Sequence, residues 1–315
     1  MSNCYQVDVW KGDWNLPSID VDCLKVLTFA KFHNISLTVI TKNNPFKTPN
    51  GYLPVLTFKK NTFSTVDEIL NVTHKNCTDC KSSPECPETV AYNIMLEDCL
   101  NPALQYLWWI DQQNLNEVIR PWYCEALPFP CNYYYPGKYE KNAKCLIESL
   151  YPTEESEDIE ALIYTKAKEC IKTLSMKLGE SQYFFGTKPT KLDALVFSYL
   201  APLLKVPLSN CSLQNCLKKR ENLVGFITRI LDLYFQNKVE NNEKNVNHDK
   251  TKKLISDTQY IDKRNQIFTG IFAGIFATGA MVGFALSKGI MQIQTNDYNY
   301  SSNYHDYDNI EDYDE

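Results

Sequence analysis

Residues 36–58 read SLTVITKNNPFKTPNGYLPVLTF, and this stretch decides the fold of the N-terminal part of the chain. It begins with a β-branched run at 36–42, which is typical of a strand. A loop rich in proline, asparagine and glycine follows at 43–54, and a second apolar run begins at Val55. The sequence therefore predicts two strands joined by an irregular loop that ends at Pro54.

The segments on either side of this stretch complete a small α/β module. Upstream, an apolar, alternating run is followed by an amphipathic helical pattern. Downstream, a hairpin pattern is followed by a closing helix. The order β-α-β followed by β-β-α is that of a thioredoxin-like domain, which we place at residues 1–76. The predicted elements are strand 5–10, turn 12–17, helix 20–32, strand 36–42, hairpin 55–58 with 61–63, and helix 65–73.

The next part of the chain, residues 88–236, is predicted to be an all-helical domain joined to the first by a cysteine-containing linker at 77–87. Pro102 should kink its first helix, and Thr190 to Asp193 is a variant capping box that opens an apolar helix. The aromatic, proline-rich stretch 128–137 is expected to be a loop. The dense aromatic side chains between Trp108 and Tyr135 fit either core packing or a partner-facing patch. The predicted helices are 88–109, 159–178, 194–204 and 217–235.

Composition excludes several classes of function. The chain has 315 residues, a net charge of −6 and 44% hydrophobic residues, which fits a globular body and no nucleic-acid partner. The N-terminus has neither a secretory signal nor an Arg-rich presequence. We therefore expect the twelve cysteines to be reduced thiols in the cytosol.

A membrane anchor is predicted near the C-terminus, from Ile267 to Leu286. These 20 residues carry no charge, and as a helix they would span about 30 Å, the thickness of a bilayer core. A polar tether at 237–266 precedes the segment, and an acidic tail rich in Tyr and Asp follows at 287–315. The alternative, a buried core helix, is disfavoured because polar sequence lies on both sides.

The basic flanks of the anchor indicate its orientation, and its composition together with these flanks indicates which membrane holds it. Basic residues lie on both sides, and those of the Lys-rich tether should keep the body in the cytosol while the tail reaches the intermembrane space. A short, moderately apolar segment with basic flanks is typical of a tail anchor of the mitochondrial outer membrane. Two glycine pairs fit either close helix packing or plain anchor composition. The flanking residues are Lys263, Arg264 and Lys288, and the glycines are Gly270, Gly274, Gly279 and Gly283.

No catalytic, cofactor or metal motif is present in the sequence. At the opening of helix 20–32, Ser18 fits a helix cap better than a weak hydroxyl catalyst. Cys77 and Cys80, with Cys86 beyond, lack the second cysteine pair that a structural zinc site needs. We therefore expect no catalytic residue, no cofactor and no metal.

Several motifs resemble known families. The turn Gly51 to Val55, where the fold would hold a cis proline at Pro54, and the opening Thr190 to Asp193 resemble a glutathione-transferase-like fold. More specific motifs, spread in order over residues 1–290, resemble the metaxin family, and the approach to the anchor resembles its membrane-anchored type. They are GDWNLPS (12–18), NPF (44–46), WID (109–111), WY (122–123), PFP (128–130), FFG (184–186), LDALVFSYL (192–200) and RNQI (264–267).

The metaxin resemblance implies a non-enzymatic subunit of the mitochondrial outer-membrane import and sorting-and-assembly machinery. Its body would pair with a second, soluble metaxin and with the β-barrel assembly core, and no small-molecule substrate is expected. Glutathione-dependent transferases place Gln or Glu before the Ser that opens their third helix, whereas Phe63 precedes Ser64 here. Transferase activity is therefore not expected. Two alternatives remain: an outer-membrane adaptor for cargo or motors, and a membrane-tethered glutathione-dependent transferase.

Overall fold

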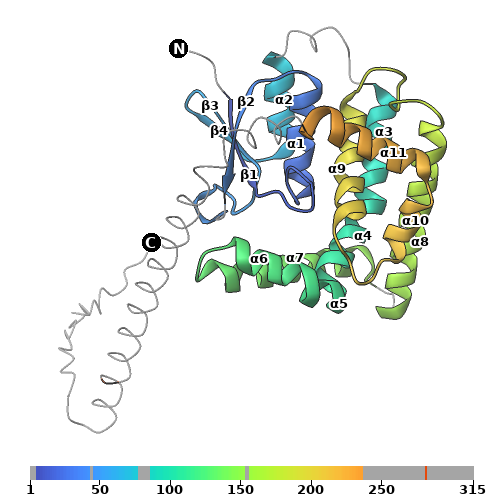
Figure 1. The fold of residues 1–315 in the computed structure, drawn as a ribbon. Helices are drawn as coiled ribbons and strands as arrows, with labels where there is room; N and C mark the ends of the chain where they lie inside the picture. The colour runs from blue at the N-terminus through green and yellow to red at the C-terminus, as the bar shows by residue number, and fades with distance from the viewer. Residues whose placement is uncertain (1–4, 43–44, 77–85, 153–155, 237–280, 282–315) are drawn as a thin grey trace, which may run out of the picture. The chain divides into compact units, whose positions relative to one another are not determined.

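The computed structural model describes residues 5–42, 45–76, 86–152, 156–236 and Met281 (Figure 1). The chain divides into two compact units, Met1–Asn247 and His248–Glu315. All the strands and helices discussed below belong to the first unit.

A four-stranded mixed sheet forms the N-terminal part, in the order β2-β1-β3-β4. Strands β1 and β2 are parallel, with Val7 opposite Val39. Strand β3 is antiparallel to both of its neighbours, with Leu56 opposite Val7 on one side and Phe63 on the other. This topology is that of the predicted thioredoxin-like domain. The strands are β1 (Tyr5–Trp10), β2 (Leu37–Lys42), β3 (Val55–Phe58) and β4 (Asn61–Phe63).

Helices make up the rest of the first unit. Two of them belong to the sheet domain, and the others surround α9 or, like α6 and α7, lie along the lower side of the first unit in the view of Figure 1. They are α1 (Val21–Phe32), α2 (Val66–Asn76), α3 (Pro87–Met95), α4 (Asn101–Gln105), α5 (Gln112–Asn114), α6 (Arg120–Ala126), α7 (Cys131–Leu150), α8 (Ser156–Leu178), α9 (Lys191–Lys205), α10 (Ser212–Lys218) and α11 (Glu221–Ile230). Short π-helical turns lie at Leu96–Leu100, Tyr106–Ile110, Leu115–Ile119 and Leu231–Phe235.

Helix α1 is apolar on almost every side, so the amphipathic pattern expected for it was wrong. Leu24, Val26, Phe29 and Ala30 point in different directions around the helix, and all are buried. The reason is its position, because α1 lies between the sheet and α9 (Figure 1). A helix covered on both sides buries its whole circumference rather than one stripe.

The turn before α1 depends on a glycine. A Cβ built on Gly12 would lie 2.2 Å from the carbonyl oxygen of Leu16, so no other residue fits there. In the same turn, Asp13 accepts a hydrogen bond of 2.8 Å from the indole N–H of Trp122 in α6. This bond ties the turn to the helical part of the unit.

The predicted loop at 128–137 is largely helix, because α7 begins at Cys131 and continues through Pro136. A proline inside a helix leaves the carbonyl four residues earlier without its N–H donor. That carbonyl belongs to Asn132, and the thiol of Cys124 donates to it at 3.5 Å. Packing of the buried Tyr139 against Trp109, at 5.3 Å between ring centroids, further holds the helix in place.

Two other helix predictions need correction. The single helix expected at 217–235 is two elements, since α10 ends at Lys218 and α11 begins at Glu221. The helix expected at 88–109 is interrupted by a π-helical turn at Leu96–Leu100 between α3 and α4, and the kink expected at Pro102 stays a prediction. A π-helical turn holds one more residue than an α-helical turn, and most such turns lie inside α-helices that continue on both sides.

Candidate functional site

A cleft of about 700 Å³ lies between the sheet domain and the helices of the first unit. Its walls come from the end of β1, the first turns of α1 and α2, the loop before β3, the stretch from α3 to Ile110, and parts of α6, α7 and α9. Such a position, between two layers of one body, is where proteins most often bind ligands.

The first turn of α1 forms one wall of this cleft. Asp20 is the N-cap, and its Oδ1 accepts the N–H of Cys23 at 2.9 Å. Ser18 is fully buried and its Oγ accepts the N–H of Asp20 at 3.4 Å. The sequence prediction that Ser18 caps the helix was therefore wrong by two residues, because it is the Asp20 side chain that accepts a free N–H of the first turn, that of Cys23.

Burial changes the acidity of Asp20 and Cys23 at this helix end. It raises the pKa of Asp20 to about 7, and the carboxylate of Asp22 adds to this increase. Burial also raises the pKa of the Cys23 thiol well above its ordinary value, with the charge of Asp20 acting in the same direction. Cys23 is therefore a neutral thiol at physiological pH, and its Sγ accepts the N–H of Trp10 at 3.5 Å.

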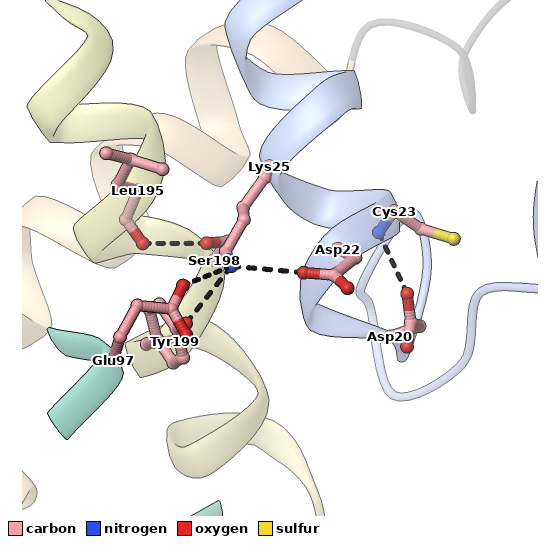
Figure 2. A network of polar contacts seen from close by, with 8 residues as sticks. All are labelled: Asp20, Asp22, Cys23, Lys25, Glu97, Leu195, Ser198 and Tyr199. Atoms are coloured by element: carbon pink, nitrogen blue, oxygen red, sulfur yellow. Dashed lines mark hydrogen bonds and ion pairs between the residues drawn. The ribbon is translucent and has the colours of Figure 1, made fainter. Parts of the chain in front are cut away.

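A buried lysine connects α1 to the helical part of the unit (Figure 2). Lys25 is only 7% exposed, and its Nζ lies 3.0 Å from Asp22 Oδ1 and 3.1 Å from Glu97 Oε1. The same ammonium donates to the hydroxyl of Tyr199 at 3.0 Å. These partners come from α1, from the π turn after α3 and from α9, so the network joins three elements.

The charge of this lysine is stabilised by its surroundings. Burial alone would lower the pKa of Lys25, but Asp22, Tyr199 and Glu97 together outweigh burial and raise it. Burial raises the pKa of the Tyr199 hydroxyl as well. Lys25 is therefore a permanent cation with all three of its donors directed at groups of the protein.

The residues proposed as fold motifs occupy the expected places. The Leu53-Pro54 peptide bond is cis. Asp193 is fully buried and accepts the N–H groups of Thr190 and Phe184, both at 2.8 Å, together with the Thr190 hydroxyl at 2.6 Å. Burial raises the pKa of Asp193, while these hydrogen bonds oppose the increase.

The cysteine group considered for zinc is only partly described. Cys86 is exposed, and Cys77 and Cys80 lie outside the described residues. Within the described ranges, His, Cys, Asp and Glu form no group of three or more that could hold a metal ion.

The predicted anchor also lies outside the description, together with its basic flanks, the tether and the tail, apart from Met281. Searched over the described ranges alone, the helices include none with the length and apolar character needed to cross a membrane.

The network around Lys25 was not predicted from the sequence. A lysine inside the run CLKVLTFA (23–30) is the one signal that was available, since a charge within an apolar helix needs a partner. Its partners Glu97 and Tyr199 are 72 and 174 residues away along the chain, and only the fold brings them together.

The chemistry of the cleft differs from that of a thiol-activating or anion-binding site. A helix N-terminus normally attracts an anion, but Asp20 already occupies this place at α1. Among the described residues that line the cleft, none is cysteine or histidine. Ser64, which lies just before α2, lines the cleft, and the preceding Phe63 is half-buried.

Two family models match parts of the chain. Residues 23–140 match the model described as outer mitochondrial membrane transport complex protein. Residues 167–230 match the model of the C-terminal domain of glutathione S-transferase. With the thioredoxin-like sheet, the second match identifies the fold as glutathione-transferase-like.

Curated relatives and solved structures give the following likenesses. The chain is 37% identical to Metaxin-1 of Macaca fascicularis over 298 residues, or 90% of each chain. It is 41% identical to Metaxin-3 of Xenopus laevis over 232 residues, covering 72% of this chain and 75% of the relative. Among solved structures, poplar glutathione transferase F1 is 12% identical with a TM-score of 0.46, covering 78% of this chain and 100% of that one. On the identity and coverage of these curated relatives, the chain belongs to the metaxin family.

Proposed function

We propose that this chain is a non-enzymatic subunit of the mitochondrial outer-membrane import and β-barrel sorting-and-assembly machinery. Membership of the metaxin family and the match to an outer-membrane transport model imply a part in import. The observation that most favours a non-enzymatic role is Asp20, which fills the N-terminus of α1 with the chain's own carboxylate.

Several features of the cleft support the same conclusion. Ser18 is fully buried, and Cys23 is buried with a raised pKa, so neither resembles an activated nucleophile. Lys25 directs its donors at Asp22, Glu97 and Tyr199, which leaves it poorly placed to bind a carboxylate of glutathione. The body therefore acts through protein contacts, with a second, soluble metaxin and the β-barrel assembly core as its partners.

The anchor at 267–286 places this body at the membrane. The body faces the cytosol in this proposal, and the tail at 287–315 reaches the intermembrane space. A cytosolic body beside the outer membrane would meet incoming polypeptides and the assembly core on the same surface.

Affinity purification tests this function. The full chain, tagged at the N-terminus, is purified from outer membranes solubilised in mild detergent, and co-purifying proteins are identified by mass spectrometry. We expect a second metaxin-type protein and the barrel-assembly core at near-stoichiometric levels. The matched control is Ile275→Arg, which should stay out of the membrane and lose the barrel-assembly core.

Two results would contradict the proposal. One is a full-length chain that co-purifies with neither partner. The other is turnover of a generic electrophile with glutathione that Ser18→Ala abolishes, which would favour the transferase alternative.

A further inference from the structure

The cleft of the first unit carries an excess of negative charge. Its walls include the carboxylates of four acidic residues but the ammonium groups of only two lysines, Lys25 and Lys191. Lys25 is committed to Asp22, Glu97 and Tyr199. Asp67 is exposed and makes no ion pair within the described part of the chain, so a cation that entered this cleft would meet an uncompensated carboxylate there. The acidic residues are Asp20, Asp22, Asp67 and Glu97.

Aromatic rings of the cleft already receive lysine ammonium groups from the protein itself. The Nζ of Lys25 lies 4.7 Å from the ring centroid of Tyr199. At another part of the wall, the Nζ of Lys138 lies 4.9 Å from the ring centroid of Tyr52. Both distances fall within the range of cation–π attraction. Carboxylates and aromatic rings together form the surroundings that a primary ammonium or a guanidinium prefers.

Two further aromatic side chains of the wall have polar atoms without a described partner. Trp108 is 6% exposed and Tyr139 is 9% exposed, and neither the indole Nε1 nor the Tyr139 hydroxyl has a hydrogen-bond partner among the described residues. An indole N–H only donates, so it needs an acceptor such as a carbonyl oxygen. A polypeptide supplies carbonyl oxygens along its backbone, whereas a simple amine does not.

We propose that this cleft binds a basic segment of a polypeptide, with a lysine or arginine side chain held by its carboxylates. The cleft volume of about 700 Å³ is sufficient for a few residues in extended form. This proposal rests on the function proposed above, since it names the class of client that an import subunit would hold. It also assigns the cleft to a cation, the opposite of the anionic tripeptide that glutathione transferases bind.

Peptide binding to the full chain in nonionic detergent tests the proposal by fluorescence anisotropy. The probe is a labelled, capped peptide that alternates lysine with alanine. One matched peptide has norleucine in place of lysine, which keeps the aliphatic stem without the charge, and another has glutamate. We expect the lysine peptide to bind about tenfold more tightly than either, with an affinity that falls as salt is raised.

The chain offers a closely matched pair of variants. Asp67 and Glu68 are neighbours in the first turn of α2, and both are exposed, but only Asp67 lines the cleft. We expect Asp67→Asn to weaken binding of the lysine peptide by about three- to fivefold. Adding Asp20→Asn should weaken it further, whereas Glu68→Gln should change it by less than about twofold. Native circular dichroism verifies that each variant is folded.

Two outcomes would overturn the proposal: tight binding of the norleucine or glutamate peptide, and equal losses for Asp67→Asn and Glu68→Gln. The partner purification described above is independent of this assay. A chain that binds the lysine peptide but lacks import partners would contradict the proposed function alone. A chain with its partners but no preference for lysine would contradict only the proposal for the cleft.

Discussion

Substitution of Lys25 by methionine should destabilise the first unit by a predictable amount. Methionine keeps most of the buried aliphatic stem but removes the cation, so Asp22, Glu97 and Tyr199 lose a shared partner. Breaking a fully buried ion pair from one side costs about 3–5 kcal/mol. The side chains of Asp22 and Glu97 are 50% and 41% exposed, so water partly replaces the lost contact. We therefore expect a loss of about 2–3 kcal/mol in the free energy of unfolding.

Equilibrium unfolding of residues 1–247 in urea measures this loss, and thermal unfolding should show a Tm lower by about 5–10 °C. Lys141→Met, an exposed lysine on α7, is the control and should change stability by less than about 0.5 kcal/mol. In the triple variant that adds Asp22→Asn and Glu97→Gln, much of the stability should return, because no carboxylate then faces an uncharged side chain. Our account of the network is refuted if Lys25→Met behaves like Lys141→Met.

Three further predictions concern other parts of the chain. The pKa of Asp20 is raised to about 7 in the folded state, so its ionisation lowers the stability of the first unit as pH rises from about 4 to 7. In urea unfolding, Asp20→Asn should therefore stabilise the unit by about 2 kcal/mol at pH 8 and by almost nothing at pH 4. Equal gains at both pH values would contradict this. In the same assay, Asp193→Ala should lower the free energy of unfolding by about 3 kcal/mol, since it removes the acceptor of three hydrogen bonds at a fully buried site. A loss below about 1 kcal/mol would show that Asp193 does not stabilise the start of α9 in this way. In the predicted anchor, Ile275→Arg should add about 2.5–3.5 kcal/mol to the free energy of membrane insertion and move the chain into the soluble fraction. The control Ile275→Leu should leave the chain in the membrane. An arginine variant that stays membrane-bound would refute the anchor.

The element order of the sheet domain was predictable from local patterns. Strand β1, helix α1, strand β2 and the β3–β4 hairpin follow the β-branched runs and turn residues of the sequence almost residue by residue. The cis bond at Pro54 and the cap at Asp193 were also predictable, because each depends on a few neighbouring residues whose motif resembles a known fold. The anchor at 267–286 stays a prediction of the same local kind.

Interactions between distant segments were not predictable in this way. The sequence at 128–137 contains enough proline to indicate a loop, yet it is helical because Cys124 and the packing of Tyr139 compensate for Pro136. Local propensity was outweighed there by contacts from other elements.

What the sequence by itself determined about this protein is its family, its fold class and the segment expected to cross a membrane, since each is written in short, contiguous motifs. What only the tertiary structure decided is the character of the cleft. The charge state of Asp20 depends on burial, and the partners of Lys25 lie up to 174 residues away. Electrostatic energy depends on distance in space and on the exclusion of water, and neither quantity can be derived from spacing along the chain.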